Sequence, residues 1–247
     1  MQKRQNAVKT VQVTVISDRG QEKKKDPVVC EHTLSIVLNK KNLLTLICSP
    51  EDLPALAVGH LFTQGFISRA DEVENVEELA DNRTVSIHVK RILKADRETV
   101  LPPGGMKLQK VRSGATVSFR RITELVRKAE ERCDVFSETG GAHACALSDT
   151  GGIVFFSEDI GRHNAIDRVI GRCLLDGVPF RDKLLFTTGR VSSVILAKSV
   201  RAGVPLLVSR SAPSFEAVRL AEEYGVTLAG FARGGRLNVY AGRGRIV

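Results

Sequence analysis

The stretch Ser157-Glu158-Asp159-Ile160-Gly161-Arg162-His163-Asn164-Ala165-Ile166-Asp167-Arg168-Val169-Ile170-Gly171 indicates how the chain is organised. It follows Ile153–Phe156, a short run of branched and aromatic residues that predicts a strand. After Gly161, apolar side chains recur with the period of one helix face, at Ile166, Val169, Ile170, Cys173 and Leu174. The stretch therefore predicts a buried strand that ends in a polar turn, and a helix that begins at this turn.

The turn carries an unusual density of ionisable side chains. Within ten positions the chain places Glu158, Asp159, Arg162, His163 and Asp167. Stability alone does not require so many charges at the carboxyl end of a strand. The alternative interpretation is a capped turn that is closed by salt bridges, and for an isolated cluster that alternative is the simpler one. The turn is therefore a candidate site that the rest of the sequence has to support.

Composition limits the class of protein. With 247 residues, 43% of them hydrophobic and 26% charged, the chain forms one large globular domain or two small ones. A net charge of +9 favours an anionic partner, such as a nucleic acid, a phosphorylated ligand or an acidic protein, although some proteins are simply basic. Aromatic residues make up only 5% of the chain and tryptophan is absent, which argues against a platform for stacked bases.

Cysteine usage and the apolar runs indicate the compartment. The five cysteines include no Cys-x-x-Cys pair, and an odd number is a poor disulfide framework: Cys30, Cys48, Cys133, Cys145 and Cys173. The first residues lack the apolar core of a signal peptide, and no apolar run approaches ~20 residues. We expect free thiols in a reducing cytoplasm, no membrane partner and no nucleic acid. Motifs for a phosphate-binding loop or a bound metal are missing.

The first half of the chain reads as β-rich. It predicts strands at 11–16, 28–37, 43–48 and 84–89, and one helix that begins with Ser49 as its cap. The run Lys23–Pro27 reads as a loop. Residues 90–116 show no sustained period and read as a linker or a long loop. We therefore predict a β-rich N-terminal part with one helix over residues 1–112.

The second half, residues 113–247, reads as an α/β core. A helix after Phe119 precedes a hairpin, and strands then alternate with helices: 143–147, 153–156, 183–186, 204–208, 226–229 and 237–240. Such alternation predicts a largely parallel sheet with helices on its faces, joined at one end to an antiparallel hairpin. In such sheets, ligands bind beyond the carboxyl ends of the strands.

Three successive strand-to-helix turns each offer an arginine, at Arg162, Arg190 and Arg210, and Arg233 and Arg236 flank the last turn. Helix N-termini favour anions, and hydroxyl donors stand nearby at Thr187, Thr188, Ser209 and Ser211. Arginine binds phosphate through two parallel hydrogen bonds, so this pattern suits a diphosphate or polyphosphate ligand. The alternative is a set of solvated arginines in unrelated turns.

The run before the hairpin adds a second candidate. Gly140 and Gly141 would allow a ligand to approach the backbone closely. His143 could donate a hydrogen bond to a ligand, carry a proton or make only a structural hydrogen bond. Cys145 shares a strand face with His143, and the alternative for it is a small buried apolar residue.

Several motifs resemble a known family. These are Glu138-Thr139-Gly140-Gly141-x-His143-x-x-Ala146, then Glu158 to Asp167, Ser211-Ala212-Pro213, the helix segment Pro50 to Phe62 and the closing Gly230-Phe231-x-Arg233. Together they are similar to the formate dehydrogenase accessory proteins, the FdhD/NarQ family, from about Val28 to the C-terminus.

The resemblance implies a cytoplasmic sulfurtransferase and sulfur carrier. Such a protein takes sulfur as a persulfide from a cysteine desulfurase. It binds the molybdenum bis(molybdopterin guanine dinucleotide) cofactor as a client and passes the sulfur to it before or during insertion into formate dehydrogenase, whose catalytic subunit is a partner. The resemblance also implies a homodimer and a three-layer fold similar to cytidine deaminases, with a mixed sheet and no zinc.

The resemblance also implies which residues bind the guanine dinucleotide: Phe231, Ala232, Arg233, Gly234, Gly235 and Arg236. We add the motif and turn residues as further candidates for cofactor binding: Gly140, His143, Asp159, Arg162, His163, Arg190 and Ser211. We assign no catalytic residue and no metal ligand. A diphosphate in the cofactor agrees with the cluster of arginines that the turns predict.

One departure from the family pattern concerns the sulfur-carrying cysteine. In the family it lies in a loop before the first helix of the α/β part, where this chain reads Arg112-Ser113-Gly114-Ala115-Thr116. No thiol means no persulfide at that loop. Three explanations stay open: the chain lacks transferase chemistry, another thiol substitutes, or loop residues are missing from the sequence. The rival functions are a cofactor-binding chaperone without catalysis and, third, a basic nucleic-acid binder.

Overall fold

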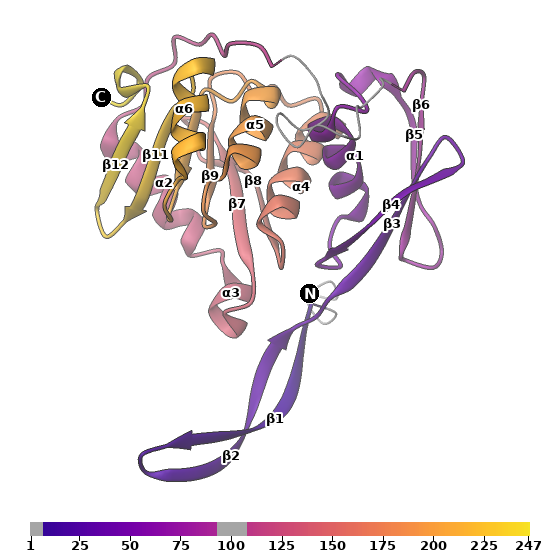
Figure 1. Ribbon diagram of the computed structural model, residues 1–247, viewed down its shortest axis with the longest axis vertical. Coiled ribbons are helices and arrows are strands. Elements are labelled where there is room, and N and C mark those ends of the chain that lie inside the picture. Colours follow the sequence, from indigo (N-terminus) through magenta and orange to yellow (C-terminus); the bar gives the residue numbers. More distant parts are fainter. Residues whose placement is uncertain (1–6, 93–107) are drawn as a thin grey trace.

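The computed structural model describes residues 7–92 and 108–247 and contains three sheets (Figure 1). Most of the predicted linker, residues 93–107, lies outside the described residues. A two-stranded ribbon, a four-stranded sheet of order β4-β3-β6-β5 and a six-stranded sheet of order β12-β11-β10-β9-β7-β8 follow one another along the chain. The mixed α/β class expected from the sequence is confirmed.

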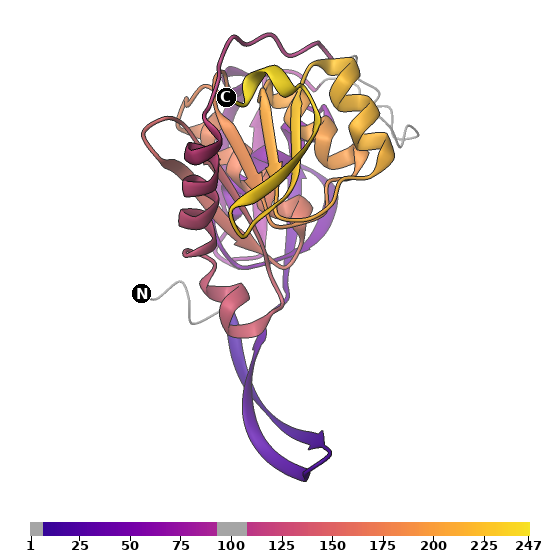
Figure 2. The same ribbon diagram turned by 90° about the vertical axis from the view of Figure 1, so that its left-hand side faces the viewer.

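The ribbon consists of β1 (Val8–Ser17) and β2 (Gly20–Val29) and projects away from the body of the molecule (Figures 1 and 2). The predicted strand at 11–16 lies within β1. The predicted loop at Lys23–Pro27 is wrong, because these residues form the middle of β2 and pair with β1, Asp26 opposite Val11. Lysines and a proline read locally as a loop, whereas the β-branched partner strand holds them extended.

The four-stranded sheet and one helix make up the rest of the N-terminal part. Its strands are β3 (His32–Leu38), β4 (Lys41–Cys48), β5 (Val73–Glu78) and β6 (Thr84–Val89), with a 3-10 turn at Ala70–Glu72. The helix α1 (Leu53–Gln64) begins after Asp52, which has a φ of 40° and makes no side-chain cap. The predicted cap by Ser49 is therefore wrong; its hydroxyl instead accepts a hydrogen bond from the backbone N–H of Ile160.

The six-stranded sheet is mixed rather than largely parallel. Its strands are β7 (His143–Ser148), β8 (Ile153–Asp159), β9 (Leu184–Thr187), β10 (Leu206–Ser209), β11 (Thr227–Arg233) and β12 (Arg236–Ala241). β9, β10 and β11 run parallel, while β7 is antiparallel to both β8 and β9. Hence β8, β9, β10 and β11 all point the same way and end at the same edge of the sheet.

Helices cover both faces of this sheet. They are α2 (Phe119–Glu130), α3 (Asp134–Thr139), α4 (Arg162–Leu175), α5 (Ser193–Ala202) and α6 (Phe215–Tyr224). Alternate residues of one strand enter two different buried clusters: Leu184 and Phe186 pack with α2, and Leu185 packs with α4 and α5. The result is a helix–sheet–helix arrangement of three layers; the likeness to cytidine deaminases stays a prediction.

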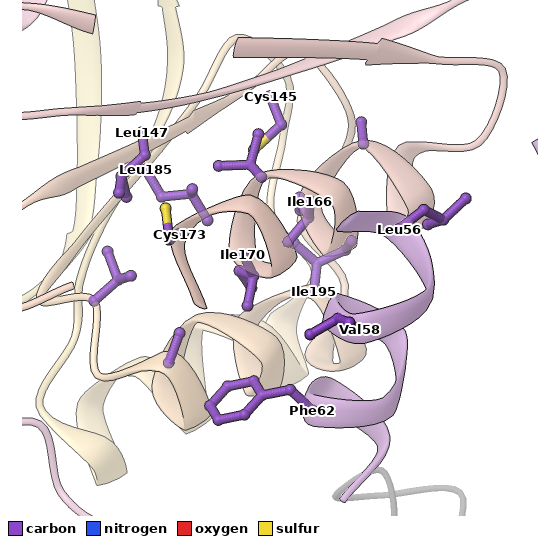
Figure 3. Close-up of a cluster of buried hydrophobic side chains, with 14 of the residues drawn as sticks. Leu56, Val58, Phe62, Cys145, Leu147, Ile166, Ile170, Cys173, Leu185 and Ile195 are labelled. Carbon is purple, nitrogen blue, oxygen red and sulfur yellow. The ribbon is translucent and has the colours of Figure 1, made fainter. Parts of the chain in front are cut away.

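The N-terminal part joins the core through a close crossing of α1 and α4 (Figure 3). A Cβ atom on Gly59 would lie 1.8 Å from the backbone oxygen of Asp167, and a Cβ on Gly171 would lie 1.8 Å from that of Ala55. Two glycines therefore let the helix backbones touch. One buried cluster extends across the crossing, so the two predicted parts share a core, and the boundary at residue 112 stays a prediction.

Candidate functional site

The carboxyl ends of β8, β9, β10 and β11 form one edge of the sheet, which we call the arginine edge because Arg162, Arg190, Arg210 and Arg233 lie there. Hydrogen bonds tie neighbouring turns together. The backbone N–H of Arg210 donates to the oxygen of Thr187 at 3.0 Å, and that of Phe231 to the oxygen of Ser211 at 3.1 Å. The fold thus brings the predicted arginine turns side by side.

Most of these arginines lack a counter-charge. Arg210 pairs with Glu130, Nε to Oε1 at 2.8 Å. The guanidinium groups of four others, in contrast, make no ion pair or hydrogen bond to any residue within 7–92 and 108–247: Arg162, Arg190, Arg233 and Arg236. The Nε atom of Arg162 is also buried without a partner among those residues. An unpaired guanidinium is costly unless water or an anion supplies acceptors, so this edge favours an anionic ligand.

Arg162 is held in place by a glycine. It is the first residue of α4, and a Cβ on Gly189 would lie 2.9 Å from its Cβ and 3.1 Å from its Cδ. The turn after β9 therefore accepts the arginine stem only because residue 189 has no side chain. This contact explains Gly189 and fixes where the Arg162 side chain leaves the helix.

The two histidines of the predicted site are neutral at pH 7. Burial lowers the pKa of His143, and the nearby charges of Arg162 and Arg190 lower it further. Burial, followed by the charges of Lys198 and Arg162, lowers the pKa of His163 to about 4. The positive charge of the arginine edge thus comes from guanidinium groups alone, and the imidazoles serve as uncharged donors or acceptors.

The acidic residues of the central motif act within the protein. Asp159 is fully buried, and its carboxylate accepts hydrogen bonds from the backbone N–H groups of Ser49 and Gly161 and from the side chains of Asn164 and Arg168. Glu158 accepts from the first backbone N–H groups of α3, at Val135 and Phe136. These contacts match the salt-bridged turn that was the alternative interpretation; direct binding of a cofactor by Asp159 stays a prediction.

A buried ion pair lies behind the motif. Asp167 is 1% exposed and binds Lys198, which is 2% exposed, at 2.5 Å. It also contacts His60 at 3.3 Å and accepts a hydrogen bond from Thr63 at 2.8 Å. We call these four residues the buried ion-pair network. The network joins α1, α4 and α5 at the glycine crossing, and it holds the helix that carries Arg162.

The hydroxyl groups at the arginine edge are occupied in joining turns. Ser211 donates to the backbone oxygen of Thr188, and Ser209 donates to that of Gly189. Thr188 accepts from the N–H of Ala144. We expected these side chains to donate to a ligand. For Ser209 and Ser211 the hydroxyl hydrogen is engaged within the chain, so their observed contribution is to align the turns.

The expectation of three free helix N-termini needs correction as well. The first turns of α5 and α6 are capped by the side chains of Ser192 and Ser214. The N-cap of α4, Gly161, makes no side-chain cap. Of these three helices only α4 lacks a side-chain cap from its N-cap residue, and even at this end the Asp159 carboxylate accepts from the N–H of Gly161.

The glycine pair before β7 has a packing explanation that the sequence did not suggest. Gly140 ends α3 with a φ of 67°, a conformation that favours glycine. A Cβ on Gly141 would lie 2.6 Å from Cγ1 of Val29, at the base of the ribbon. The pair thus shapes the chain between α3 and His143, and binding of a ligand at Gly140 stays a prediction.

A pocket of about 460 Å³ lies beside the arginine edge, between α2 and the hairpin of β11 and β12. Apolar side chains (Ile122, Val126, Leu237), arginines (Arg120, Arg233, Arg236) and Ala232, Gly234 and Gly235 are among its lining residues. Phe231 has a φ of 53°, and the pairing of the two strands shifts between Gly230 and Arg233. This irregularity changes the direction of the backbone at the start of the predicted cofactor-binding stretch 231–236.

The sequence missed the contribution of α2 to this pocket. Arg120 lies in the first turn of α2, makes no ion pair within the described ranges and lines the pocket together with Arg236. An exposed arginine near the start of an amphipathic helix carries no signal of its own in the sequence. Only the packing of α2 under β11 reveals its role.

The segment 112–116, where the family's cysteine would lie, is at the other edge of the sheet. The side chain of Ser113 donates to Asp182, just before β9, and the N–H of Val111 donates to the oxygen of Tyr224, at the end of α6. β9 has four residues, so about 13 Å of strand separates this edge from the arginine edge. The segment therefore faces away from the predicted cofactor residues.

Four of the five free cysteines are buried. Burial raises the pKa of the thiols of Cys48, Cys133 and Cys173 to about 12, and that of Cys145 well above its usual value. Thiols in such surroundings are poor nucleophiles. Cys30 is only partly buried and lines a cavity of about 380 Å³ together with Lys9 and His32.

The described residues contain no cluster of three or more metal-binding side chains of the His, Cys, Asp and Glu types. No helix in residues 7–92 or 108–247 has the length and apolar character needed to cross a bilayer.

Comparison with known proteins identifies the family. The sequence model of the FdhD/NarQ family matches residues 29–247. "Sulfur carrier protein FdhD" of Listeria innocua is 35% identical over 237 residues, which cover 89% of this chain and 91% of the relative. The protein of the same name from Bacillus subtilis is 32% identical, and the match covers 91% of this chain and 92% of that relative. The crystal structure of a formate dehydrogenase accessory protein from Desulfotalea psychrophila superimposes with a TM-score of 0.86 at 28% identity, covering 98% of this chain and 100% of that one. The resemblance seen in the motifs is thereby confirmed, and the chain belongs to the FdhD/NarQ family.

Proposed function

We propose that this protein is a formate dehydrogenase maturation factor that binds the molybdenum bis(molybdopterin guanine dinucleotide) cofactor as its cargo. The observation that supports it best is the set of unpaired arginines at one edge of the sheet, beside a pocket of about 460 Å³. The names of its relatives, a sulfur carrier and a formate dehydrogenase accessory protein, agree with this function.

The residues present fit a guanine nucleotide. Apolar side chains of α2 and Leu237 offer a surface for the flat base. Glu124, whose pKa is lowered to about 2 by hydrogen bonds from Lys128 and Arg121, stays ionised in the same pocket and can accept from the two N–H donors of guanine. Arg233 and Arg236 would then bind the diphosphate, with Arg162 and Arg190 along the edge for the second nucleotide.

Calorimetry with GDP tests the proposal. We expect the wild type to bind GDP more tightly than ADP, because adenine lacks the adjacent N1–H and N2–H donors through which guanine can bind both oxygens of a carboxylate. Arg233→Ala and Arg236→Ala should each weaken binding by about 1–3 kcal/mol, the scale of a charged hydrogen bond. The matched control is Arg243→Ala, which removes the same charge from the exposed 3-10 turn Arg243–Arg245 that follows β12. No GDP affinity in the wild type would contradict the proposal.

A specific observation favours a second candidate, a cofactor-binding chaperone that transfers no sulfur. The loop at 112–116 has no thiol, and four of the five cysteines are buried with raised pKa values. A chaperone would bind the cofactor and deliver it to the catalytic subunit of formate dehydrogenase without carrying sulfur itself.

A transfer assay separates the two candidates. The protein is incubated with a cysteine desulfurase and ³⁵S-cysteine, and its intact mass and label are measured before and after reduction. A reducible label supports a sulfurtransferase with a substitute thiol, and Cys30→Ser shows whether this partly exposed cysteine carries it. Absence of label, with GDP binding retained, supports the chaperone.

A further inference from the structure

A cavity of about 380 Å³ lies where the chain passes from the ribbon into the four-stranded sheet (Figure 1). Cys30, in the two-residue link between β2 and β3, and His32, the first residue of β3, both line it. Of the five cysteines in the chain, Cys30 alone is partly exposed and the other four are buried. We propose that Cys30 is the thiol on which this protein carries sulfur, as a persulfide whose outer sulfur atom lies in this cavity.

His32 gives an independent indication of a ligand in this cavity. Its ring nitrogen Nε2 is buried and makes no hydrogen bond to any residue within 7–92 and 108–247, the thiol of Cys30 included. A buried polar atom without a partner costs free energy, so a group from outside the folded chain is expected to supply one. The outer sulfur of a persulfide suits this position, because it lies about 2 Å beyond the sulfur of the thiol.

No other thiol of the chain suits this role. Relatives of the chain are named sulfur carriers, and a carrier needs a thiol that a sulfur donor can reach. Cys48, Cys133 and Cys173 are buried, with thiol pKa values that burial raises to about 12, and Cys145 is fully buried. A donor therefore reaches Cys30 without any opening of the core, and it reaches the other four only if the core opens.

The position of Cys30 also suits delivery of sulfur to the arginine edge. Its neighbour Val29 packs against Gly141, where an added Cβ would lie 2.6 Å from Cγ1 of Val29. Gly141 comes two residues before His143, which pairs with Asp159 at the arginine edge. One packing contact and a few residues of chain therefore separate the thiol from the predicted cofactor residues, whereas the segment in which the family's cysteine would lie is at the other edge of the sheet.

Loading of Cys30 is an exchange between a thiol and a persulfide, with no net oxidation or reduction. The thiolate of Cys30 attacks the outer sulfur of a donor persulfide, its new sulfur–sulfur bond forms as that of the donor breaks, and the donor leaves as a thiolate that takes up the proton Cys30 has lost. Lys9 lines the cavity, but so do the carboxylates of Glu31 and Glu78. A hydrogen bond with His32, rather than net charge, would therefore hold the outer sulfur.

This inference rests on the proposed maturation function, to which it adds the carriage of sulfur, and a small persulfide donor tests it without a desulfurase. The full chain is incubated with glutathione persulfide and capped with iodoacetamide, and its peptides are mapped by mass spectrometry. We expect the mass of one added sulfur atom on Cys30 and none on the buried cysteines. Cys30→Ser should abolish the addition, and the matched control Cys133→Ser should leave it unchanged.

GDP binding is measured on the same samples, so that the two proposals can fail separately. A protein that binds GDP but gains no sulfur on Cys30, or gains it on another cysteine, would overturn the assignment of Cys30 and leave the cofactor-binding function standing. A protein that gains sulfur on Cys30 but does not bind GDP would support the assignment and contradict the cofactor-binding function.

Variants of His32 distinguish a built site from a thiol that is merely exposed. His32→Leu removes Nε2 and should shift the exchange equilibrium with glutathione persulfide about fivefold toward the free thiol, as expected for the loss of one hydrogen bond. His32→Gln, whose amide can take the place of Nε2, should recover most of this loss, and His88→Leu on β6 is the control that should behave as the wild type. An exchange equilibrium that is the same in His32→Leu and the wild type would overturn the proposed site.

Discussion

Helix α4 separates two clusters of charge that are built in opposite ways. On its buried side, the ion-pair network matches Lys198 with Asp167 and surrounds the carboxylate with His60 and Thr63. At its N-terminus, Arg162 lies beside Arg190 without a carboxylate partner in the described part of the chain. Both clusters draw on the same run, residues 158–167. A high density of charged residues therefore does not by itself mark a binding site, whereas charge without a partner does.

The two clusters have different roles. A buried, fully paired cluster serves to fix the positions of α1, α4 and α5, and it binds nothing from outside. An unpaired cluster at a sheet edge contributes little to folding and leaves its hydrogen-bond donors for a ligand. Substitutions in the first should therefore change stability, and substitutions in the second should change binding.

Lys198→Met should produce the largest effect. It removes the cation while Asp167 stays buried, so the free energy of unfolding should fall by about 3–5 kcal/mol, the usual cost of an unpaired buried charge. Urea unfolding followed by circular dichroism measures this change. The double variant Lys198→Met with Asp167→Leu should recover much of the loss. Equal stability of Lys198→Met and the wild type would show that the pair is not desolvated as the structure has it.

Gly59→Ala should produce the next largest loss of stability. Alanine normally stabilises a helix interior relative to glycine by about 0.5–1 kcal/mol. Here the new methyl group would lie 1.8 Å from the backbone oxygen of Asp167, so the helices must separate, at a cost of about 1–3 kcal/mol. Thermal unfolding should show the loss. Gly114→Ala, where a Cβ would meet nothing within 4 Å, is the control and should be neutral.

Much of the fold follows from local pattern. The period of apolar residues after Gly161 predicts α4, and the alternation of strands and helices predicts the layers on the six-stranded sheet. The local pattern of residues does not show which strands pair with one another. The lysines of β2 are extended because β1 lies beside them, and β7 lies between β8 and β9, which makes the sheet mixed. In both cases a neighbouring strand that is not adjacent in the local pattern decides the structure, whereas the local sequence alone predicted a loop and a largely parallel sheet.

The candidate site, too, could be predicted from the sequence only in part. The arginines could be placed at one edge from the sequence, because strands that point the same way end together. The sequence could not show which of these arginines lack an ion-pair partner, because the partner of Arg210 is Glu130 of α2, which is far away in the sequence. The roles of Ser209 and Ser211 in joining turns likewise depend on the exact approach of neighbouring loops.

The partly buried histidine of α4 should make the stability of the protein depend on pH. The pKa of His163 is about 4 in the folded protein and about 6.5 in an unfolded chain, so between these values the unfolded state binds more protons. Stability should therefore be full above pH 6.5 and fall by about 1–2 kcal/mol as the pH drops to 4.5, discounting for the partial exposure of the ring. His163→Gln should flatten this slope. A wild type whose stability is constant from pH 7 to pH 4.5 would contradict the assignment.

Arg162→Gln and Arg190→Gln should produce the smallest change in stability and still change function. Neither guanidinium has a partner to lose among the described residues, so unfolding free energies should stay within about 0.5 kcal/mol of the wild type. Removing one of two neighbouring positive charges should also reduce their mutual repulsion, most clearly at low ionic strength. If an anion bridges the two arginines, each variant should bind nucleotide more weakly. Added nucleotide should then raise the unfolding temperature of the wild type but not that of either variant. A variant that unfolds more readily but binds GDP as before would place Arg162 with the buried network, and the contrast between the two ends of α4 would then be lost.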